Sequence, residues 1–530
     1  MLLFPQFSDS PRLYTGRECA AIDAHLQTAF GASSASLMQQ AAAAAYDVLR
    51  ECWPDVRRVI VCAGVGNNAG DGYYLAALAS AAGCAVTLLQ LEGRALTGAA
   101  GEAQQSLPPT VTRIDVTSSE GPIWDRAIAA LTTADLVVDA LLGIGLSTAP
   151  RPLFAALIER MNQAPAPVFA LDVPSGLDAD RGSAPGALVQ AAHTATFLVD
   201  KVALHSGAGV GGTVSVHPLG LPARALATQP GLRALRGDDL SLPPLPKTVY
   251  KHRLGHLVVV GGDQGMGGAT MLAAEAGLRS GAGMVSLITR PEHVAPALAR
   301  LPELMVCSTA RWPAVLALLA RADVMVCGPG LGQGAWGRAL LNAVLAAPGQ
   351  RVLDADALNL LADPTHSTPV PPGAILTPHS GEAARLLGQP SSTIEADRLS
   401  AVNELSTRYQ AVAVLKGPGT LIGAPEAPPA LCLEGQPGMA SAGMGDVLAG
   451  LAGGLLAQLT RVADPAADAF AAPWAAAAGA VVLHGTAGGR AGERGAVRTL
   501  SASVLLEMLP AVIAAAEARG QGGQGRRDHE

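Results

Sequence analysis

The chain has 530 residues, of which 49% are hydrophobic and 15% are charged, with a formal net charge of -7. This length predicts two or more domains with well-buried cores, and the acidic balance offers no basic surface for nucleic acid. The seven cysteines include no CxxC pair and no Cys/His cluster at zinc spacing, which favours reduced thiols. Residues 1–14 lack a signal-peptide pattern and no apolar window is long enough to cross a bilayer, so we expect a cytoplasmic protein without a membrane segment.

Lysine is scarce: Lys201, Lys247, Lys251 and Lys416 stand against 32 arginines. None of the four lysines follows a glycine, so the phosphate-binding pattern GxxxxGK[ST] does not occur in the sequence. A nucleotide would have to be bound in another way.

The first half of the chain reads as an α/β unit. Residues 58–63 (RVIVCA) predict a buried strand, followed by a glycine turn that contains NNAGDG and by a helix from Tyr73. Strand, glycine turn and helix are typical of dinucleotide binding, although GxGxxA alone also occurs in plain tight turns. Further strands are predicted at residues 85–90, 136–139, 168–172 and 194–199, with helical stretches between them. This alternation predicts a parallel sheet covered on both faces.

Three of these strands end in polar side chains, namely Asn67 and Asn68, Asp139, and Asp172. A single Asp at a strand end is more often a cap than a catalyst. Three polar strand ends, each beside a glycine turn, favour a ligand site at the carboxyl edge of the sheet. Asn68, Asp139 and Ser175 offer only oxygen ligands, which suits a hard cation.

The motifs NNAGDG, DALLGIGL and DVPSGLDAD, in this order and spacing, resemble the NAD(P)H-hydrate epimerase domain of the bifunctional hydrate-repair family. The resemblance implies a potassium ion on Asn68, Asp139 and Ser175, with Asp172 as the acid/base. It also implies that the hydrated nucleotide is contacted by Asn67, Asn68, Ala69, Gly70, Asp71, Gly143, Ile144, Gly145, Leu146, Ser147, Thr148, Ala149 and Asp172. Ala69 stands where the family usually has glycine, which is tolerable only if the backbone there is not left-handed.

Residues 222–246 are rich in Pro, Leu and Arg without sustained periodicity, which indicates a linker. We therefore predict a first domain at residues 1–225, a linker at 226–246 and a second domain at 247–519. The polar, glycine-rich residues 520–530 are predicted to form a disordered tail.

The second half predicts another α/β unit, with strands at residues 256–261, 285–288, 305–307, 324–327, 352–354, 374–376 and 412–415. Near its end, an uncharged glycine-rich loop at 438–445 leads to Asp446 and an apolar helical run. Backbone N–H groups at a helix N-terminus favour an anion, and Asp446 could act as a base toward a hydroxyl. The alternative is a turn whose Asp only caps the helix. Lys416 before a glycine turn suggests a phosphate contact, with an exposed strand-end charge as its alternative.

The motifs GPGLG, DADAL, TPHSGE, LKGPGT and GMASAGMGDVLAG resemble, in order, the ribokinase-like NAD(P)H-hydrate dehydratase domain. The resemblance implies an adenine nucleotide on Lys416, Gly417, Pro418, Gly419, Thr420 and Gly445. It implies the hydrate on Ala269, Gly330, His379 and Asp446, with Asp446 as catalytic base and residues 443–445 as the anion hole.

The predicted fold is an N-terminal Rossmann-like three-layer sandwich followed by a ribokinase-like domain. The predicted function is repair of hydrated NADH and NADPH: the first domain interconverts the R and S hydrates, and the second dehydrates the S form while ADP becomes AMP and phosphate. The resemblance implies ADP or ATP as co-substrate, with K⁺ and Mg²⁺, and we expect a homo-oligomer. Two alternatives stay open, a hydroxymethylpyrimidine- or sugar-type kinase fused to a nucleotide-binding module, and a first half that only senses a nucleotide or binds a partner.

Overall fold

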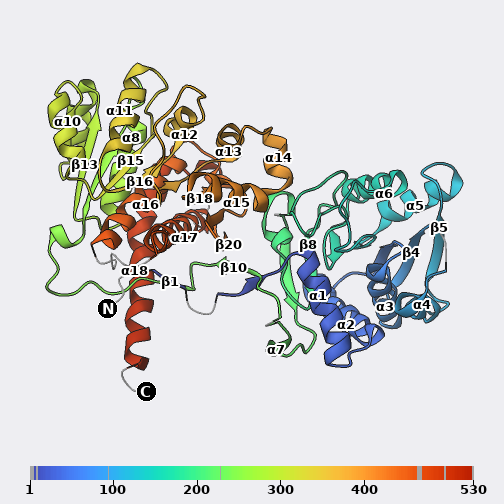
Figure 1. The fold of residues 1–530 in the computed structure, drawn as a ribbon. Helices are drawn as coiled ribbons and strands as arrows, with labels where there is room; N and C mark the ends of the chain where they lie inside the picture. Colours follow the sequence, from blue (N-terminus) through green and yellow to red (C-terminus); the bar gives the residue numbers. More distant parts are fainter. Residues whose placement is uncertain are drawn as a thin grey trace. The chain divides into compact units, whose positions relative to one another are not determined.

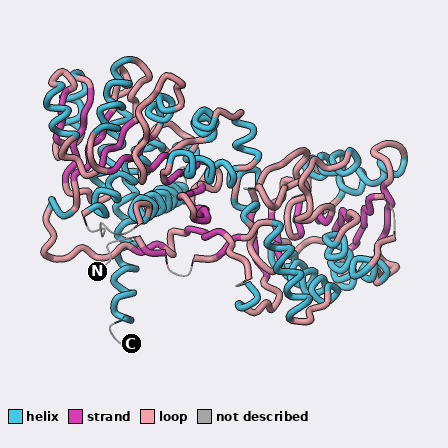
Figure 2. The backbone as a smooth tube through the Cα atoms, in the orientation of Figure 1, coloured by secondary structure: helices cyan, strands magenta, loops and turns pink. Residues whose placement is uncertain are grey.

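The computed structural model describes residues 5–7, 10–92, 95–209, 211–226, 228–461, 468–493 and 497–527. The chain forms two compact units. The N-terminal unit comprises residues 12–232, and the C-terminal unit comprises residues 1–11 together with 233–530. In each unit, strands lie between layers of helices (Figure 1, Figure 2), which confirms the predicted two-domain α/β fold. No helix among the described residues is long and apolar enough to span a membrane.

The N-terminal unit is built on a parallel sheet with the strand order β5-β4-β3-β6-β7-β8-β9. Its strands are β3 (Arg58–Ala63), β4 (Ala85–Leu91), β5 (Thr112–Val116), β6 (Leu136–Ala140), β7 (Val168–Leu171), β8 (His193–Phe197) and β9 (Thr213–His217). The chain passes from β3 out to β5 and returns to the other side of β3 at β6. The strand order therefore reverses between β3 and β6, and ligands of such sheets bind at the carboxyl ends of the strands beside that reversal.

Helices cover both faces of this sheet (Figure 1). On β3, Val59 and Val61 belong to the core beneath α2 (Ser34–Cys52), α3 (Asn67–Ala81) and α4 (Gly98–Gln105). The alternate side chains Ile60 and Cys62 belong to the core beneath α5 (Pro122–Thr133) and α6 (Pro152–Gln163), as expected for a strand buried on both faces. The remaining elements of the unit are β2 (Arg12–Leu13), α1 (Gly16–Ala29), α7 (Ala223–Leu226) and the 3-10 turns η1 (Val202–His205) and η2 (Gly207–Gly209).

Helix α3 begins six residues earlier than predicted. We expected the helix to start at Tyr73, but it starts at Asn67, with Gly66 as its N-cap. The NNAGDG motif thus forms the first turns of α3 rather than an extended loop. Ala69 lies inside this helix and is absent from the positions with positive φ, so its methyl group meets no backbone strain.

The C-terminal unit contains a larger, mixed sheet in which the strands follow the order β14-β13-β12-β15-β16-β17-β18-β19-β20-β10. The strands pair in parallel except for the antiparallel turns from β18 to β19 and from β19 to β20. They are β10 (Leu232–Leu235), β12 (His256–Val260), β13 (Met284–Thr289), β14 (Met305–Ser308), β15 (Val324–Cys327), β16 (Gln350–Leu353), β17 (Ile375–Leu376), β18 (Val412–Leu415), β19 (Leu421–Ala424) and β20 (Ala427–Cys432).

One face of this sheet is covered by α8 (Gly267–Arg279), α16 (Met444–Thr460), α17 (Ala471–Glu493) and α18 (Ala502–Arg527). Helix α16 approaches α8 so closely that a Cβ atom at Gly450 would collide with the Ala273 carbonyl oxygen. The other helices and turns are η3 (Lys251–Arg253), η4 (Pro291–His293), α9 (Val294–Arg300), α10 (Trp312–Leu319), α11 (Ala335–Ala346), α12 (Ala355–Leu361), α13 (Ser380–Leu387), α14 (Ser391–Ala396), α15 (Arg398–Tyr409), η5 (Pro437–Met439) and η6 (Val497–Thr499).

The unit boundaries differ from the predicted domains at both ends. Residues 226–246 were predicted as a linker, yet they contain β10 and the short strand β11 (Leu240–Ser241). Residues 1–11 were assigned to the first domain, but β1 (Gln6–Phe7) pairs antiparallel with β11, and Phe7 packs edge-on against Trp474 of α17. Helix α18 continues through Arg527, into the predicted disordered tail. Two-residue strands carry too little pattern to be recognised in sequence, and long-range pairing alone forms them.

Phe7 is expected to stabilise the C-terminal unit from the other end of the chain. Because its half-buried ring packs on Trp474, Phe7→Ala should lower the free energy of unfolding of this unit by about 2 kcal/mol, roughly half the cost for a fully buried Phe. Calorimetry with two resolved transitions measures this change. Phe30→Ala is the matched control, since Phe30 is half-buried against His25 in the N-terminal unit; it should shift only the other transition. Equal shifts of both transitions by Phe7→Ala would contradict the assignment.

Candidate active sites

A cavity of about 510 Å³ lies in the N-terminal unit where β3, β6, β7 and β8 end. Of the predicted nucleotide contacts, the cavity wall contains Asn67, Asn68, Asp71, Gly143, Ile144, Gly145, Leu146 and Asp172. Ala69 and Gly70 are buried behind it, and Gly70 is in tight contact with the Met38 side chain. Ser147, Thr148 and Ala149 are exposed and do not line this cavity. The structure thus groups the residues nearest the three strand ends and leaves the end of the second glycine loop outside.

Asn68, Asp139 and Ser175 meet at one end of this edge. The Asp139 carboxylate is fully buried and accepts hydrogen bonds from the Ser175 hydroxyl at 2.6 Å and the Ser175 amide at 2.7 Å. Burial raises the pKa of Asp139 to about 6, although the hydrogen bonds from Ser175 oppose that rise. Asn68 donates its amide to the Leu142 carbonyl, while its own Oδ1 is buried without a hydrogen-bond partner. A bound cation would satisfy this orphaned oxygen, so the residues fit a hard cation.

Asp172 follows β7 and occupies a left-handed backbone conformation, with a φ of 64°. Such a conformation costs a residue with a Cβ of order 1–3 kcal/mol, and it persists only where surrounding contacts hold it. Its carboxylate lies 2.8 Å from the ammonium of Lys201, which is 2% exposed. Asp71 lines the same cavity, and burial, reinforced by the charge of Asp172, raises its pKa well above the ordinary range. The cavity therefore contains one ion-paired carboxylate and one that favours the neutral acid.

Asp446 occupies the first turn of α16, three residues after the left-handed N-cap glycine Gly443. Gly443 has a φ of 89°, and a Cβ there would come within 2.7 Å of Leu272, so both conformation and space require glycine. Burial raises the pKa of Asp446 to about 7; the charge of Asp354 adds to the rise and that of Lys416 opposes it. A carboxyl group with such a pKa is suited to accept a proton near neutral pH.

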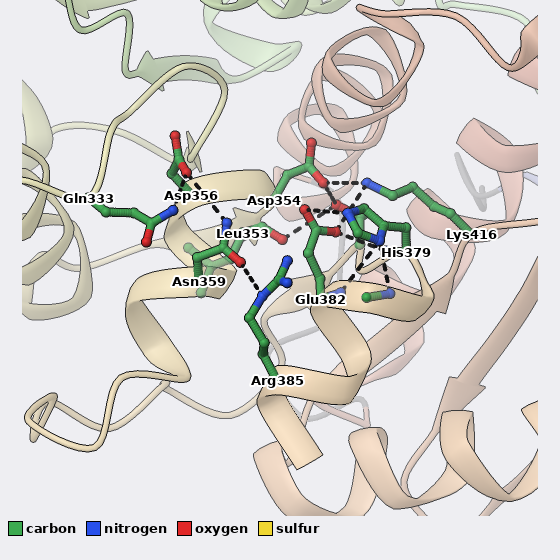
Figure 3. A network of polar contacts seen from close by, with 11 residues as sticks. Gln333, Leu353, Asp354, Asp356, Asn359, His379, Glu382, Arg385 and Lys416 are labelled. Carbon is green, nitrogen blue, oxygen red and sulfur yellow. Dashed lines mark hydrogen bonds and ion pairs between the residues drawn. The ribbon is translucent and has the colours of Figure 1, made fainter. Parts of the chain in front are cut away.

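Lys416 follows β18 and points toward Asp354 and Glu382 (Figure 3). Its ammonium lies 2.7 Å from Asp354 Oδ1 and 3.7 Å from Glu382 Oε2. A Cβ atom at Gly445 would lie 3.3 Å from the Lys416 ammonium nitrogen. The structure therefore brings together Lys416, Gly445 and Asp446, which were predicted from two separate motifs. Gly417, Pro418, Gly419 and Thr420 form the partly to fully exposed turn that follows.

His379 caps the N-terminus of α13 beside Lys416 (Figure 3). Its Nδ1 accepts a hydrogen bond from the Gly381 amide at 3.0 Å, which places the ring proton on Nε2. Nε2 lies 3.4 Å from Glu382 Oε1, and the side chain is 55% exposed. The two other predicted hydrate contacts form a separate pair, because a Cβ at Gly330 would lie 3.3 Å from the Ala269 Cβ. This pair lies after β15 and at the start of α8.

The comparisons with known proteins agree with this two-site arrangement. Residues 34–203 match the family described as YjeF-related protein N-terminus, and residues 257–511 match NAD(P)H-hydrate dehydratase. The bifunctional NAD(P)H-hydrate repair enzyme Nnr of Coxiella burnetii is 40% identical over 507 residues, which cover 94% of this chain and 99% of that protein. The chain belongs to the bifunctional NAD(P)H-hydrate repair enzyme family.

Two further relatives extend the comparison. Nnr of Escherichia coli K12 is 40% identical over 486 residues, covering 90% of this chain and 89% of that protein. Among solved structures, an ADP/ATP-dependent NAD(P)H-hydrate dehydratase from Bacillus subtilis, co-crystallized with ATP/Mg²⁺, is 29% identical. It covers 52% of this chain and 95% of its own, with a TM-score of 0.45. Each family match falls within one structural unit, and membership in the repair family sets aside the fused-kinase and sensor-module alternatives.

Four charged residues near these sites were not among the site residues predicted from the sequence. Asp354, Glu382 and Lys201 occur in or near the quoted strand-end motifs, and the scarcity of lysine was a signal that could have identified Lys201. Arg398 had no such signal, because it stands outside every motif. Its fully buried guanidinium donates to the carbonyl oxygens of Leu415, Lys416 and Gly419 at 3.3–3.4 Å. These hydrogen bonds fix the conformation of the turn after β18.

Asp446 is expected to give dehydration a pH dependence centred near neutrality. Only the ionised carboxylate accepts a proton, and its pKa is raised to about 7, so kcat/KM should rise with pH through about 7 and level off above it. Asp446→Asn should remove this limb and reduce the rate by on the order of 10²-fold, with nucleotide affinity and thermal stability retained. Initial rates across pH 5.5–8.5 measure both effects. Near-normal turnover in Asp446→Asn would reduce this residue to a helix cap.

Proposed function

We propose that the N-terminal unit interconverts the R and S hydrates of NADH and NADPH, and that the C-terminal unit dehydrates the S form at the expense of ADP. The observation that carries the second assignment is the meeting of Asp446, Lys416 and the α16 N-terminus. There, one base of suitable pKa, one cation and free backbone N–H groups converge. Family membership supports the pairing of the two activities in one chain.

The chemistry of dehydration explains why a kinase-like site would serve it. The hydrate carries water added across the C5=C6 bond, and hydroxide is a poor leaving group. We propose that Asp446 takes the C6 hydroxyl proton as the terminal phosphoryl group of ADP moves to that oxygen. The amides of residues 443–445 and the α16 dipole stabilise the developing charge, and Lys416 neutralises the phosphates. Loss of phosphate with a C5 proton then restores the dihydronicotinamide, leaving AMP.

Two cations belong to the proposal. K⁺ would be held by Asn68, Asp139 and Ser175, where the unpartnered Asn68 Oδ1 is available, and would supply positive charge beside the cavity. Mg²⁺ is held mainly by nucleotide phosphates with one or two carboxylates. Asp354 fits that role, since its buried carboxylate lies beside Lys416 and close enough to Asp446 for its charge to raise the pKa of Asp446.

For epimerisation, we propose that Asp172 takes and returns the C6 hydroxyl proton. Opening of the C6–N1 bond gives an aldehyde, and closure from the other face gives the other epimer. The ring nitrogen gains a proton on opening and loses it on closure, so no net proton is consumed. Asp71, whose raised pKa favours the neutral acid in the same cavity, is placed to supply and recover that proton.

The division of labour predicts a stall when one site is disabled. With mixed hydrates of NADPH and excess ADP, the wild-type chain should restore the near-ultraviolet absorbance of the whole sample. Asp172→Asn should restore only the S fraction at a normal rate and then slow to the spontaneous exchange rate. Addition of a fragment covering residues 12–232 should relieve the stall. If Asp172→Asn clears both hydrates as fast as the wild type, the assignment of epimerisation to this site fails.

Potassium is expected to bind the N-terminal unit and to support epimer exchange. KCl should raise the unfolding temperature of that unit relative to NaCl at equal ionic strength, because K⁺ binds only the folded site. Asp139→Asn should abolish the thermal response and the potassium dependence of exchange. Asp115→Asn is the control, since Asp115 is an exposed carboxylate on β5. Equal behaviour in sodium and potassium for the wild type would contradict the cation site.

A further inference from the structure

Lys201 is a charged side chain buried almost completely beside the N-terminal cavity, and the proposed steps do not use it. Its ammonium lies 2.8 Å from Asp172 Oδ1 and donates to Thr196 Oγ1 at 2.7 Å. It also reaches the carbonyl oxygens of Phe197 and Val199 at 3.2 and 3.3 Å. An ammonium has three N–H donors, and these four acceptors saturate them. Lys201 therefore has no donor left for a ligand and cannot be the group that protonates the substrate.

The polar contacts of the Asp172 carboxylate involve one of its two oxygens, Oδ1. The ion pair with Lys201 falls on Oδ1, and so do the hydrogen bonds from the Thr196 hydroxyl at 3.4 Å and the Phe197 amide at 3.3 Å. Oδ2 is consequently the oxygen available to a molecule in the cavity that Asp172 lines. The backbone of Asp172 is left-handed, as is that of Leu198, and the Lys201 ammonium ties the two strained segments together through Asp172, Phe197 and Val199.

The positive charge of Lys201 offsets the negative charge of several acidic groups around the Lys201–Asp172 pair. Asp71 from α3 lines the same cavity as Asp172, and its pKa is raised by burial and, to a smaller extent, by the charge of Asp172. Cys19 and Asp23 from α1 line the same cavity, and Asp200 precedes Lys201 in the chain. Burial alone would lower the pKa of Lys201, but the nearby charges, above all that of Asp172, raise it overall. Lys201 is thus a permanent cation among acidic groups, and its removal would leave Asp172 facing Asp71 without compensation.

We infer that Lys201 is a positioning residue for epimerisation, which rests on the function proposed above. It forms the ion pair that holds Asp172, fixes the orientation in which Oδ2 faces the cavity, and has no N–H donor left for the substrate. Asp71 can then remain the neutral acid opposite an ionised base, because only one of the two neighbouring carboxyl groups has a cation bound to it. The difference between these two aspartates of one cavity is set by a third residue of the cavity wall, whose ammonium is buried.

The test compares Lys201→Gln with Lys201→Arg in the full-length chain. Exchange of purified R hydrate into S hydrate is followed by chromatography without ADP across pH 5–9. Glutamine retains hydrogen bonding and removes the charge, so the pH at which exchange activity rises should move at least one unit higher. The rate at pH 7 should fall about tenfold or more. Arginine retains the charge, so exchange activity should rise at the same pH as in the wild type, even where the larger side chain reduces the rate. Dehydration of S hydrate with ADP, catalysed by the other unit, should be unchanged in both variants.

Three outcomes separate the possibilities. A wild-type pH profile in Lys201→Gln, or a rate loss that is equal at every pH, overturns the inference and leaves Lys201 a structural residue. If Asp172→Asn retains full exchange, the proposed function of this site fails instead. Should Lys201→Gln not fold, Lys201→Gln/Asp172→Asn decides the matter. The double variant should recover the folded N-terminal unit if the unpaired carboxylate was the cause, and its failure to fold overturns the inference.

Discussion

A lysine paired with an aspartate at a strand end lies at the centre of each unit's site, and one partner of each pair is almost fully buried. Lys201 lies 2.8 Å from Asp172, which follows β7, and Lys416 lies 2.7 Å from Asp354, which follows β16. An ion pair withdrawn from water must be fully hydrogen-bonded, because the loss of either partner leaves a buried charge uncompensated. The surrounding structure meets this condition in both units: Thr196 and two carbonyl groups complete the contacts of Lys201, and Thr377 donates to Asp354. Two of the four lysines of the chain are used in this way.

Each pair also sets the state of a neighbouring carboxyl group. Asp71 lies near the ion-paired Asp172, and Asp446 lies near the ion-paired Asp354; in both cases burial and the adjacent charge raise the pKa of the second carboxyl. In each unit, one carboxyl group is thus ion-paired and its neighbour has a raised pKa. Small residues make the approach possible, since a side chain at Gly445 would contact the Lys416 ammonium and one at Gly443 would displace Leu272.

Sequence reasoning recovered most of the strands and the principal site motifs, and most of the failures share a physical cause. The predicted strands were buried runs such as Val324–Cys327, whose apolar pattern is local. Of the strands that it missed, β19 and β20 lie inside the larger sheet. The others are short or lie at an edge: β5 exposes Thr112, Arg113 and Asp115 to solvent, and β1 and β11 form only by pairing with each other across the chain. The predicted linker failed for the same reason, because composition does not show which distant strand a segment joins.

The amino-acid sequence by itself determined the α/β class, the two-site organisation and the family, because glycine loops and strand-end acids recur at fixed spacing along it. It also placed Asn68, Asp139 and Ser175, and Lys416 and Asp446, among the candidate residues. Only the tertiary structure decided how these groups are paired. The contact between Lys201 and Asp172 spans 29 residues, that between Lys416 and Asp354 spans 62, and the contact of Arg398 with the turn after β18 belongs to no motif. Burial and distance set the charge states in these sites, and both arise only when strands far apart in the chain become neighbours in a sheet.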